Sequence, residues 1–190
     1  MGLSLIVGLG NPGAEYADTR HNAGFRFLEA FAAAHGVALR GERRFQGRTG
    51  VARIDGRELR LLAPDTFMNH SGEAVARLAR YYKIPAQEIL VVHDELDLPP
   101  GAVRLKLGGG DAGHNGLGDI TTQLGTPDYY RLRIGIGRPA SSAQVINFVL
   151  KRASRAEQEQ IDAAIARALD NLPDIVAGRM EKAMNALHAK

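Results

Sequence analysis

The order of hydrophobic and polar positions along the chain predicts strands and helices in alternation. Two continuous apolar runs, typical of strands buried on both faces of a sheet, lie at residues 3–9 and 89–92. Two segments that alternate like strands with one exposed face lie at residues 104–107 and 131–136. Residues 51–62 predict a hairpin, because β-prone residues flank the turn-forming pair Asp55 and Gly56.

Apolar residues at helical spacing predict helices between these strands. The first helix covers residues 25–32, and Gly36 is placed to end it. A second is expected to have Ser71 as its cap and to stop at Pro85. A glycine-rich loop, residues 108–116, leads into a third and shorter helix.

The last third of the chain is predicted to be helical. Ser154 and Glu157 form a capping box at the start of one helix, and Pro173 marks the start of the last one. Because the sequence contains no internal repeat, low-complexity tract or linker, residues 1–190 are interpreted as one domain. We expect an α/β three-layer sandwich in which helices flank a mixed, mostly parallel, twisted sheet.

The amino-acid composition limits the cellular compartments and the binding partners that we expect for this protein. Hydrophobic residues make up 45% of the 190 positions, but no apolar run approaches the roughly 20 residues that span a bilayer. The apolar N-terminus lacks the basic start of a signal peptide. The absence of cysteine excludes disulfides, thiolate metal sites and a cysteine nucleophile, and it fits the cytoplasm. A net charge of +3 and a pI near 9.4 permit a nucleic-acid partner. We expect a monomer with no membrane association.

A glycine motif at residues 8–13 matches the dinucleotide-binding pattern G-x-G-x-x-G. In that pattern a helix opens at once and its N-terminus holds the pyrophosphate. Here Pro12 lies within the turn, and the helical pattern begins only near Asn22. We therefore interpret the motif as a tight turn after a buried strand.

Histidines and carboxylates offer acid–base chemistry. His21 precedes a predicted helix, and Asp94 ends a buried strand, where an unpaired carboxylate is costly. Asp94 can orient one ring nitrogen of a histidine and leave the other as a base. The sequence leaves open whether that histidine is His21, His93 or His114.

The acidic cluster around Asp94 suggests a metal as an alternative. Along an extended chain, however, Asp94 and Glu95 point to opposite faces, so that their oxygens and those of Asp97 do not converge. We therefore expect no metal and no cofactor. Without a cysteine or a serine in a nucleophile elbow, a hydrolase of this sequence is expected to use water directly.

Three asparagines, Asn11, Asn69 and Asn115, each lie in a turn marked by glycine or proline. Neutral amides both donate and accept hydrogen bonds, which suits the binding of a carbonyl and a water molecule. Because turns favour asparagine in any case, each of them taken singly has a structural explanation.

Taken together, these motifs resemble the bacterial peptidyl-tRNA hydrolase family. The matching segments occur in the family's order at residues 7–13 (VGLGNPG), 16–24, 67–72 (FMNHSG), 93–99 (HDELDLP), 113–117 (GHNGL) and 131–137 (RLRIGIG). The resemblance implies hydrolysis of the ester between a peptide and the terminal ribose of tRNA, which recycles tRNA from stalled translation.

The resemblance also implies a role for individual residues. His21 would be the general base, Asp94 would orient it, and Asn11 would select substrates with a blocked α-amino group. The residues that would line the cleft are Tyr16, Phe67, Met68, Asn69, His114 and Asn115. Lys106 and Arg133 would clamp the 5′-phosphate of the tRNA, and C-terminal helices would form a lid.

Two other functions remain alternatives to this interpretation. One is a metal-dependent phosphoesterase that uses Asp94, Glu95 and Asp97, and the other is a non-catalytic RNA-binding protein of the same fold.

Overall fold

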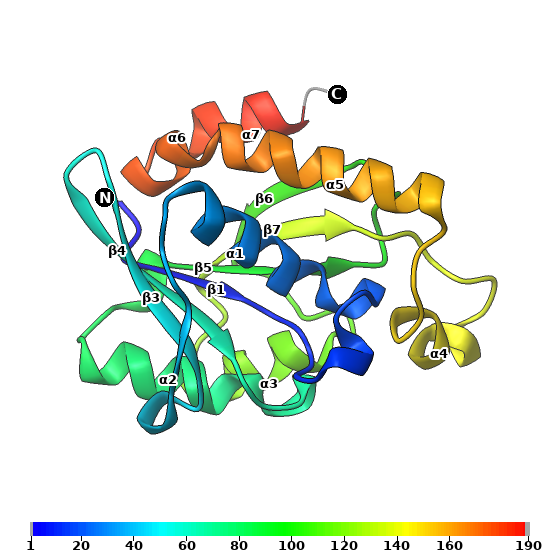
Figure 1. Cartoon of the computed structure of the whole chain (residues 1–190), viewed down its shortest axis with the longest axis horizontal. Coiled ribbons are helices and arrows are strands. Elements are labelled where there is room, and N and C mark those ends of the chain that lie inside the picture. The colour runs from blue at the N-terminus through cyan, green and yellow to red at the C-terminus, as the bar shows by residue number, and fades with distance from the viewer. Residues whose placement is uncertain (1, 189–190) are drawn as a thin grey trace.

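The computed structural model describes residues 2–188 and contains one seven-stranded sheet with helices on both faces (Figure 1). The strand order is β2-β3-β4-β1-β5-β7-β6. The strands are β1 (Leu5–Gly8), β2 (Arg40–Glu42), β3 (Gly47–Ile54), β4 (Arg57–Pro64), β5 (Ile89–Glu95), β6 (Val103–Leu107) and β7 (Tyr130–Gly135). Strands β4, β1, β5 and β7 are mutually parallel in the centre, whereas β2, β3 and β6 pair antiparallel at the two edges.

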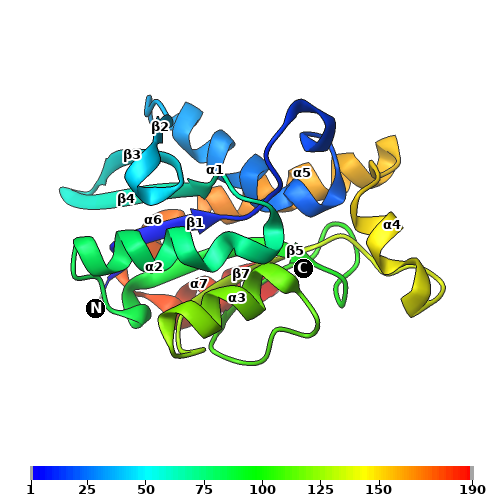
Figure 2. The ribbon, with the colours of Figure 1, turned by 90° about the horizontal axis from the view of Figure 1, so that it is seen from below.

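Two apolar layers hold the helices to the sheet. The helices are α1 (Ala23–Ala34), α2 (Ser71–Tyr81), α3 (Asn115–Leu124), α4 (Val145–Val149), α5 (Arg155–Asp170), α6 (Leu172–Ala177) and α7 (Met180–His188). Helices α1, α5, α6 and α7 pack on one face of the sheet, and α2 and α3 pack on the other, as Figure 2 shows from below. The predicted three-layer α/β sandwich with a mixed sheet is therefore confirmed.

The predicted hairpin is also confirmed. Strands β3 and β4 pair antiparallel from Gly47 opposite Pro64 to Ile54 opposite Arg57. Asp55 and Gly56 connect them with φ angles of 51° and 79°. Both angles are positive, as a two-residue turn that matches the twist of the strands requires.

Several local predictions were wrong. Ser71 is the first residue of α2 but does not cap it, because its hydroxyl donates to the carbonyl of Met68. The same helix ends at Tyr81, well before Pro85, because Lys83 adopts a left-handed conformation. The helix predicted after Pro173 is two helices, since Gly178 caps the first with φ of 88°.

The C-terminal helices do not cover a cleft as a lid. The apolar sides of α5, α6 and α7 are buried against the sheet, where leaving it would expose them to water. The short helix α4, which the hydrophobic pattern did not reveal, borders the cleft described below. Of the helices described between residues 2 and 188, none has the length and apolarity to cross a membrane.

The glycines of the first motif allow close packing of α1. An added Cβ at Gly8 would lie 2.4 Å from the carbonyl oxygen of Gly24, and one at Gly24 would lie 2.3 Å from that of Val92. These distances are too short for any side chain, so the two glycines let α1 approach the carboxyl ends of β1 and β5. This packing explains the glycines without a nucleotide.

We predict that Gly24→Ala lowers the free energy of unfolding by about 1–3 kcal/mol, the usual cost of overpacking a core. Urea denaturation measures the change. The matched control is Gly41→Ala, because a Cβ at Gly41 meets no atom within 4 Å. Equal unfolding free energies for the two variants would contradict this account of the packing.

Candidate active site

A cleft of about 420 Å³ opens where the central parallel strands end. Open α/β sheets bind their ligands at this edge. The turn after β1, the end of β5 and the turns before α1, α2 and α3 all contribute to its walls. The predicted residues that line it are Asn11, Tyr16, His21, Phe67, Met68, Asn69, Asp94, His114 and Asn115. Lys106 and Arg133 do not line it.

Asp94 lies at the base of the cleft and accepts a hydrogen bond on each carboxylate oxygen. His21 Nδ1 lies 2.8 Å from Asp94 Oδ2, and His114 Nε2 lies 2.8 Å from Asp94 Oδ1. The two histidines come from opposite sides of the sheet, His21 from the turn before α1 and His114 from the N-cap of α3. The structure thus brings together three residues that are distant in sequence.

These contacts determine where each imidazole carries its proton. An ionised carboxylate only accepts, so the proton of His21 is on Nδ1 and its Nε2 has a free lone pair. His114 donates from Nε2, and its Nδ1 accepts from the backbone N–H of Leu117 at 3.3 Å. His114 is therefore a neutral donor to Asp94, whereas His21 has a bare nitrogen with which to accept a proton.

Burial and charge act in opposite directions on the pKa values of this group. Burial by itself raises the pKa of Asp94, but His21 and His114 together hold it well below its usual range. Burial lowers the pKa of His21, and the charge and hydrogen bond of Asp94 outweigh this effect, so the pKa is raised above its ordinary value. His21 is accordingly a stronger base than a free histidine.

His93 is buried beneath this group and stays neutral. Its Nδ1 donates to the carbonyl oxygen of Asp94 at 2.8 Å, and its ring meets the ring of His114 edge-on at 5.1 Å. Burial, together with the nearby His114 and Arg131, lowers the pKa of His93 to about 3. Of the three histidines that the sequence left open, His21 is the one whose ring is oriented by the carboxylate and has a free nitrogen.

Asn11 connects three segments of the cleft wall. Its backbone N–H and C=O both bond to the side chain of Asn22, and its Oδ1 accepts from the backbone N–H of Met68 at 2.7 Å. The amide is therefore oriented with its oxygen occupied. Within the described part of the chain its NH₂ group has no partner, so it is available as a donor in the cleft.

The remaining walls combine exposed amides with apolar side chains. Asn69 and Asn115 are exposed at the starts of α2 and α3. Phe67 is 56% exposed and meets Tyr16 edge-on at 6.2 Å. Helix α4 adds an apolar wall that includes Ile146, which is 72% exposed. The cleft can therefore hold a chain of amide groups beside apolar side chains.

Comparisons with known proteins agree with this geometry. The family model described as peptidyl-tRNA hydrolase matches residues 5–190. A peptidyl-tRNA hydrolase of Pseudomonas savastanoi pv. phaseolicola is 58% identical over 99% of this chain and 97% of its own length. The chain belongs to the peptidyl-tRNA hydrolase family. A Neisseria meningitidis relative of the same name is 52% identical over 99% of this chain and 98% of its own.

A solved member of the peptidyl-tRNA hydrolase family has the same fold. The crystal structure of the enzyme from Acinetobacter baumannii superimposes with a TM-score of 0.96 at 49% identity, covering 98% of this chain and 95% of that one. The family prediction made from the six sequence motifs is thus confirmed.

The predicted phosphate clamp lies outside the cleft in this member of the peptidyl-tRNA hydrolase family. Lys106 and Arg133 are on the same face of the antiparallel pair β6–β7, where Lys106 lies opposite Arg131. The Lys106 ammonium is beside Gly109 of the glycine-rich loop, and Arg133 Nε donates to Glu95 at 2.9 Å. Lys106 therefore lies by that loop, and Arg133 adjoins the cleft through Glu95.

The acidic residues do not form the metal site that was considered. Asp94 binds the two histidines, Glu95 binds Arg133 and Asp97 pairs with Arg138, so the three carboxylates diverge. His21, Asp94 and His114 do present ligand atoms within 4.8 Å of one another. Their short hydrogen bonds already account for this arrangement.

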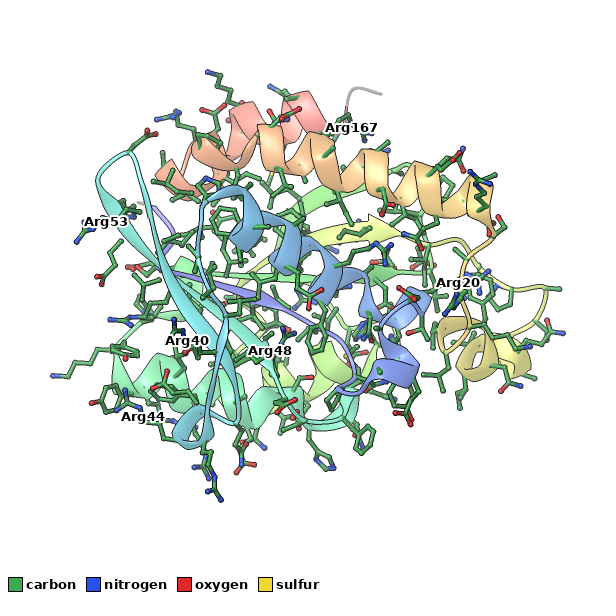
Figure 3. The ribbon with its side chains drawn as sticks, viewed as in Figure 1. Arg20, Arg40, Arg44, Arg48, Arg53 and Arg167 are labelled. Carbon is green, nitrogen blue, oxygen red and sulfur yellow. The ribbon has the colours of Figure 1, made fainter. Side chains whose placement is uncertain are left out.

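Sequence reasoning missed how the peptidyl-tRNA hydrolase motif around His21 anchors α4. Arg20, labelled in Figure 3, stacks over the ring of Phe148 at 3.8 Å and donates to the Phe148 carbonyl at 2.8 Å. It also lies 3.5 Å from Glu157. An apolar residue at position 148 gives no sequence signal for such a contact. Arg20 thus ties the apolar wall of the cleft to the turn that carries His21.

We predict that Asp94→Asn lowers the pKa of His21. The substitution removes the negative charge that raises this pKa, whereas the burial that lowers it remains. A proton NMR titration of the His21 ring measures the pKa in both proteins. An unchanged pKa would show that Asp94 does not control the protonation of His21.

Proposed function

We propose that this chain hydrolyses the ester that joins a peptide to the 3′-terminal ribose of tRNA, with His21 as its general base. The observation that carries the proposal is the orientation of His21, whose Nδ1 is held by Asp94 at 2.8 Å and whose Nε2 is free. Membership of the peptidyl-tRNA hydrolase family supports the reaction.

In the proposed mechanism, His21 Nε2 takes a proton from a water molecule as the oxygen attacks the ester carbonyl. A tetrahedral intermediate forms, and the imidazolium then returns the proton to the ribose oxygen as the C–O bond breaks. Asp94 stays ionised and stabilises the imidazolium. General-base assistance of this kind contributes about a hundred- to ten-thousandfold to a rate.

The amides of the cleft are proposed to hold the constant parts of the substrate. Asn69 and Asn115 would bind the peptide backbone and the ester carbonyl, between Tyr16, Phe67, Met68 and His114. Such contacts are independent of the peptide's side chains, which suits a substrate of variable sequence.

Asn11 is proposed to distinguish a blocked α-amino group from a free one. Its oriented NH₂ group is a donor and requires an acceptor in the substrate. The acyl group on a blocked amine brings a carbonyl oxygen, whereas a free α-ammonium brings only further donors. Aminoacyl-tRNA would therefore leave the buried donor unpaired, which costs binding energy.

Lys106 and Arg133 are proposed to bind the 5′-phosphate of the tRNA. Lys106 lies beside the glycine-rich loop and Arg133 beside Glu95 at the rim of the cleft, on a face that also carries Arg104, and this position supports the role. Phosphate contacts place a nucleic acid without reading its sequence. We propose further that residues 1–190 act as one domain and a monomer in the cytoplasm, where ribosomes produce peptidyl-tRNA.

We predict that the protein releases N-acetyl amino acid from acetyl-aminoacyl-tRNA, in the presence of a chelator, and spares unblocked aminoacyl-tRNA. His21→Ala is expected to lower kcat by at least about a hundredfold, because the general base is lost. His35→Ala is the matched control, since His35 is exposed at the end of α1 and lies outside the cleft.

Three outcomes would contradict parts of this proposal. Full activity of His21→Ala would remove His21 from the mechanism. Loss of activity with chelator would favour the metal-dependent alternative. No cleavage by folded wild-type protein would favour the non-catalytic RNA-binding alternative.

We predict that Lys106→Ala and Arg133→Ala raise KM for the tRNA substrate with little change in kcat. The increase should be larger at low salt, because counterions screen phosphate contacts. Arg53→Ala is the control, since Arg53 lies on β3, towards the edge of the sheet opposite to β7 and β6, and Figure 3 shows it at one end of the molecule. An unchanged KM in both clamp variants would refute the phosphate contact.

A further inference from the structure

Arg131 is a buried charge that the mechanism above does not use. It lies in β7, next to the strand that carries Asp94, and is only 2% exposed. Among residues 2–188 it forms no ion pair with a carboxylate. A buried charge without a counter-ion is costly, and an apolar side chain of similar volume would fill the same space at lower cost.

Backbone carbonyls take the place of that counter-ion. The Arg131 guanidinium donates to the carbonyl oxygens of Gly110 at 2.6 Å, Gly109 at 2.9 Å and Pro127 at 3.1 Å. It also stacks over the ring of Tyr129 at 4.4 Å. Arg131 therefore fixes the first part of the glycine-rich loop to the sheet.

A short chain of contacts leads from this anchor to the catalytic carboxylate. Asp111 follows Gly110 directly, and its carbonyl and side chain accept the backbone N–H groups of His114 and Gly113 at 2.8 and 2.9 Å. His114 then donates to Asp94. Glycines at the start of the loop give it little rigidity of its own. Its shape depends on these bonds.

We propose that Arg131 is a positioning residue of the hydrolase reaction, which holds the glycine-rich loop so that His114 reaches Asp94. This inference rests on the proposed function of His21. The planar guanidinium has five donors spread over three nitrogens and can reach carbonyls that lie apart, whereas the three donors of a lysine ammonium lie on a single nitrogen.

Replacing Arg131 is expected to change the pKa of His21 as well as the position of the glycine-rich loop. Without the bond from His114, the full charge of Asp94 acts on His21 and raises the pKa of His21 further. His21 must be unprotonated to act as a base. The acid limb of the pH profile of kcat/KM therefore moves to higher pH when Arg131 is replaced, which a loss of global stability alone does not produce.

The test is a double-mutant cycle between Arg131→Met and His114→Ala, read in kcat on acetyl-aminoacyl-tRNA well below the melting temperature. Arg131→Met should lower kcat at least about tenfold, as misplacement of catalytic groups by about an ångström does, and should shift the acid limb upwards. In the His114→Ala background the same substitution should lower kcat less than about twofold. Coupling of this kind identifies residues that act through one another.

Arg167→Met is the matched control. Arg167, on α5, also donates to a loop carbonyl, that of Gly101 at 3.1 Å, but lies away from the cleft (Figure 3). It should change neither kcat nor the acid limb. If Arg131→Met does not fold, Arg131→Lys is used in the same cycle, since it keeps the charge but not the two guanidinium nitrogens that reach the three carbonyls.

Equal losses of kcat in both backgrounds, or an unshifted acid limb, would overturn the role of Arg131. Full activity of His114→Ala would overturn it as well, because the proposed route from Arg131 to the base runs through the bond from His114 to Asp94. Inactivity of the wild-type protein itself would instead refute the proposed function.

Discussion

The hydrogen bonding of one buried carboxylate, that of Asp94, is the interaction on which the cleft depends. Asp94 is placed by the central strand β5 where it is only 3% exposed, and removing a partner of such a buried charge costs about 3–5 kcal/mol. It obtains two partners, His21 and His114, from segments on opposite sides of the sheet. The need to satisfy this charge positions both walls of the cleft and sets the tautomer of His21 at the same time.

The same principle extends to the neighbouring segments, since polar side chains tie each loop of the cleft to another. The amide of Asn11 joins the turn after β1 to Met68, and Arg20 joins the turn of His21 to α4. Arg131 joins the glycine-rich loop to the sheet. Loops that would be mobile alone are thereby ordered around His21, so that the proposed reaction would need little reorganisation of the site.

The sequence predicted the helices and strands that have a strong hydrophobic periodicity. It did not predict the features that depend on tertiary contacts. The buried strands, the hairpin at Asp55 and Gly56 and the capping box at Ser154 follow from local rules. Local rules do not predict the role of Ser71, the division of the last helix or the position of α4. Competing local contacts or tertiary packing determine these features. The residues around the cleft were named from motif order. Their pairing, and the choice of His21 over His93 and His114, required the three-dimensional contacts.

Asp94 holds His21 by Nδ1 and leaves its Nε2 bare, while His114 donates to the same carboxylate. Nitrogen-15 NMR of the histidine rings at a pH above their titration tests this arrangement most directly, because the chemical shifts report which nitrogen carries the proton. We predict that His21 is protonated on Nδ1 and His114 on Nε2. Finding His21 protonated on Nε2 would contradict it, since that nitrogen could not then accept a proton from water.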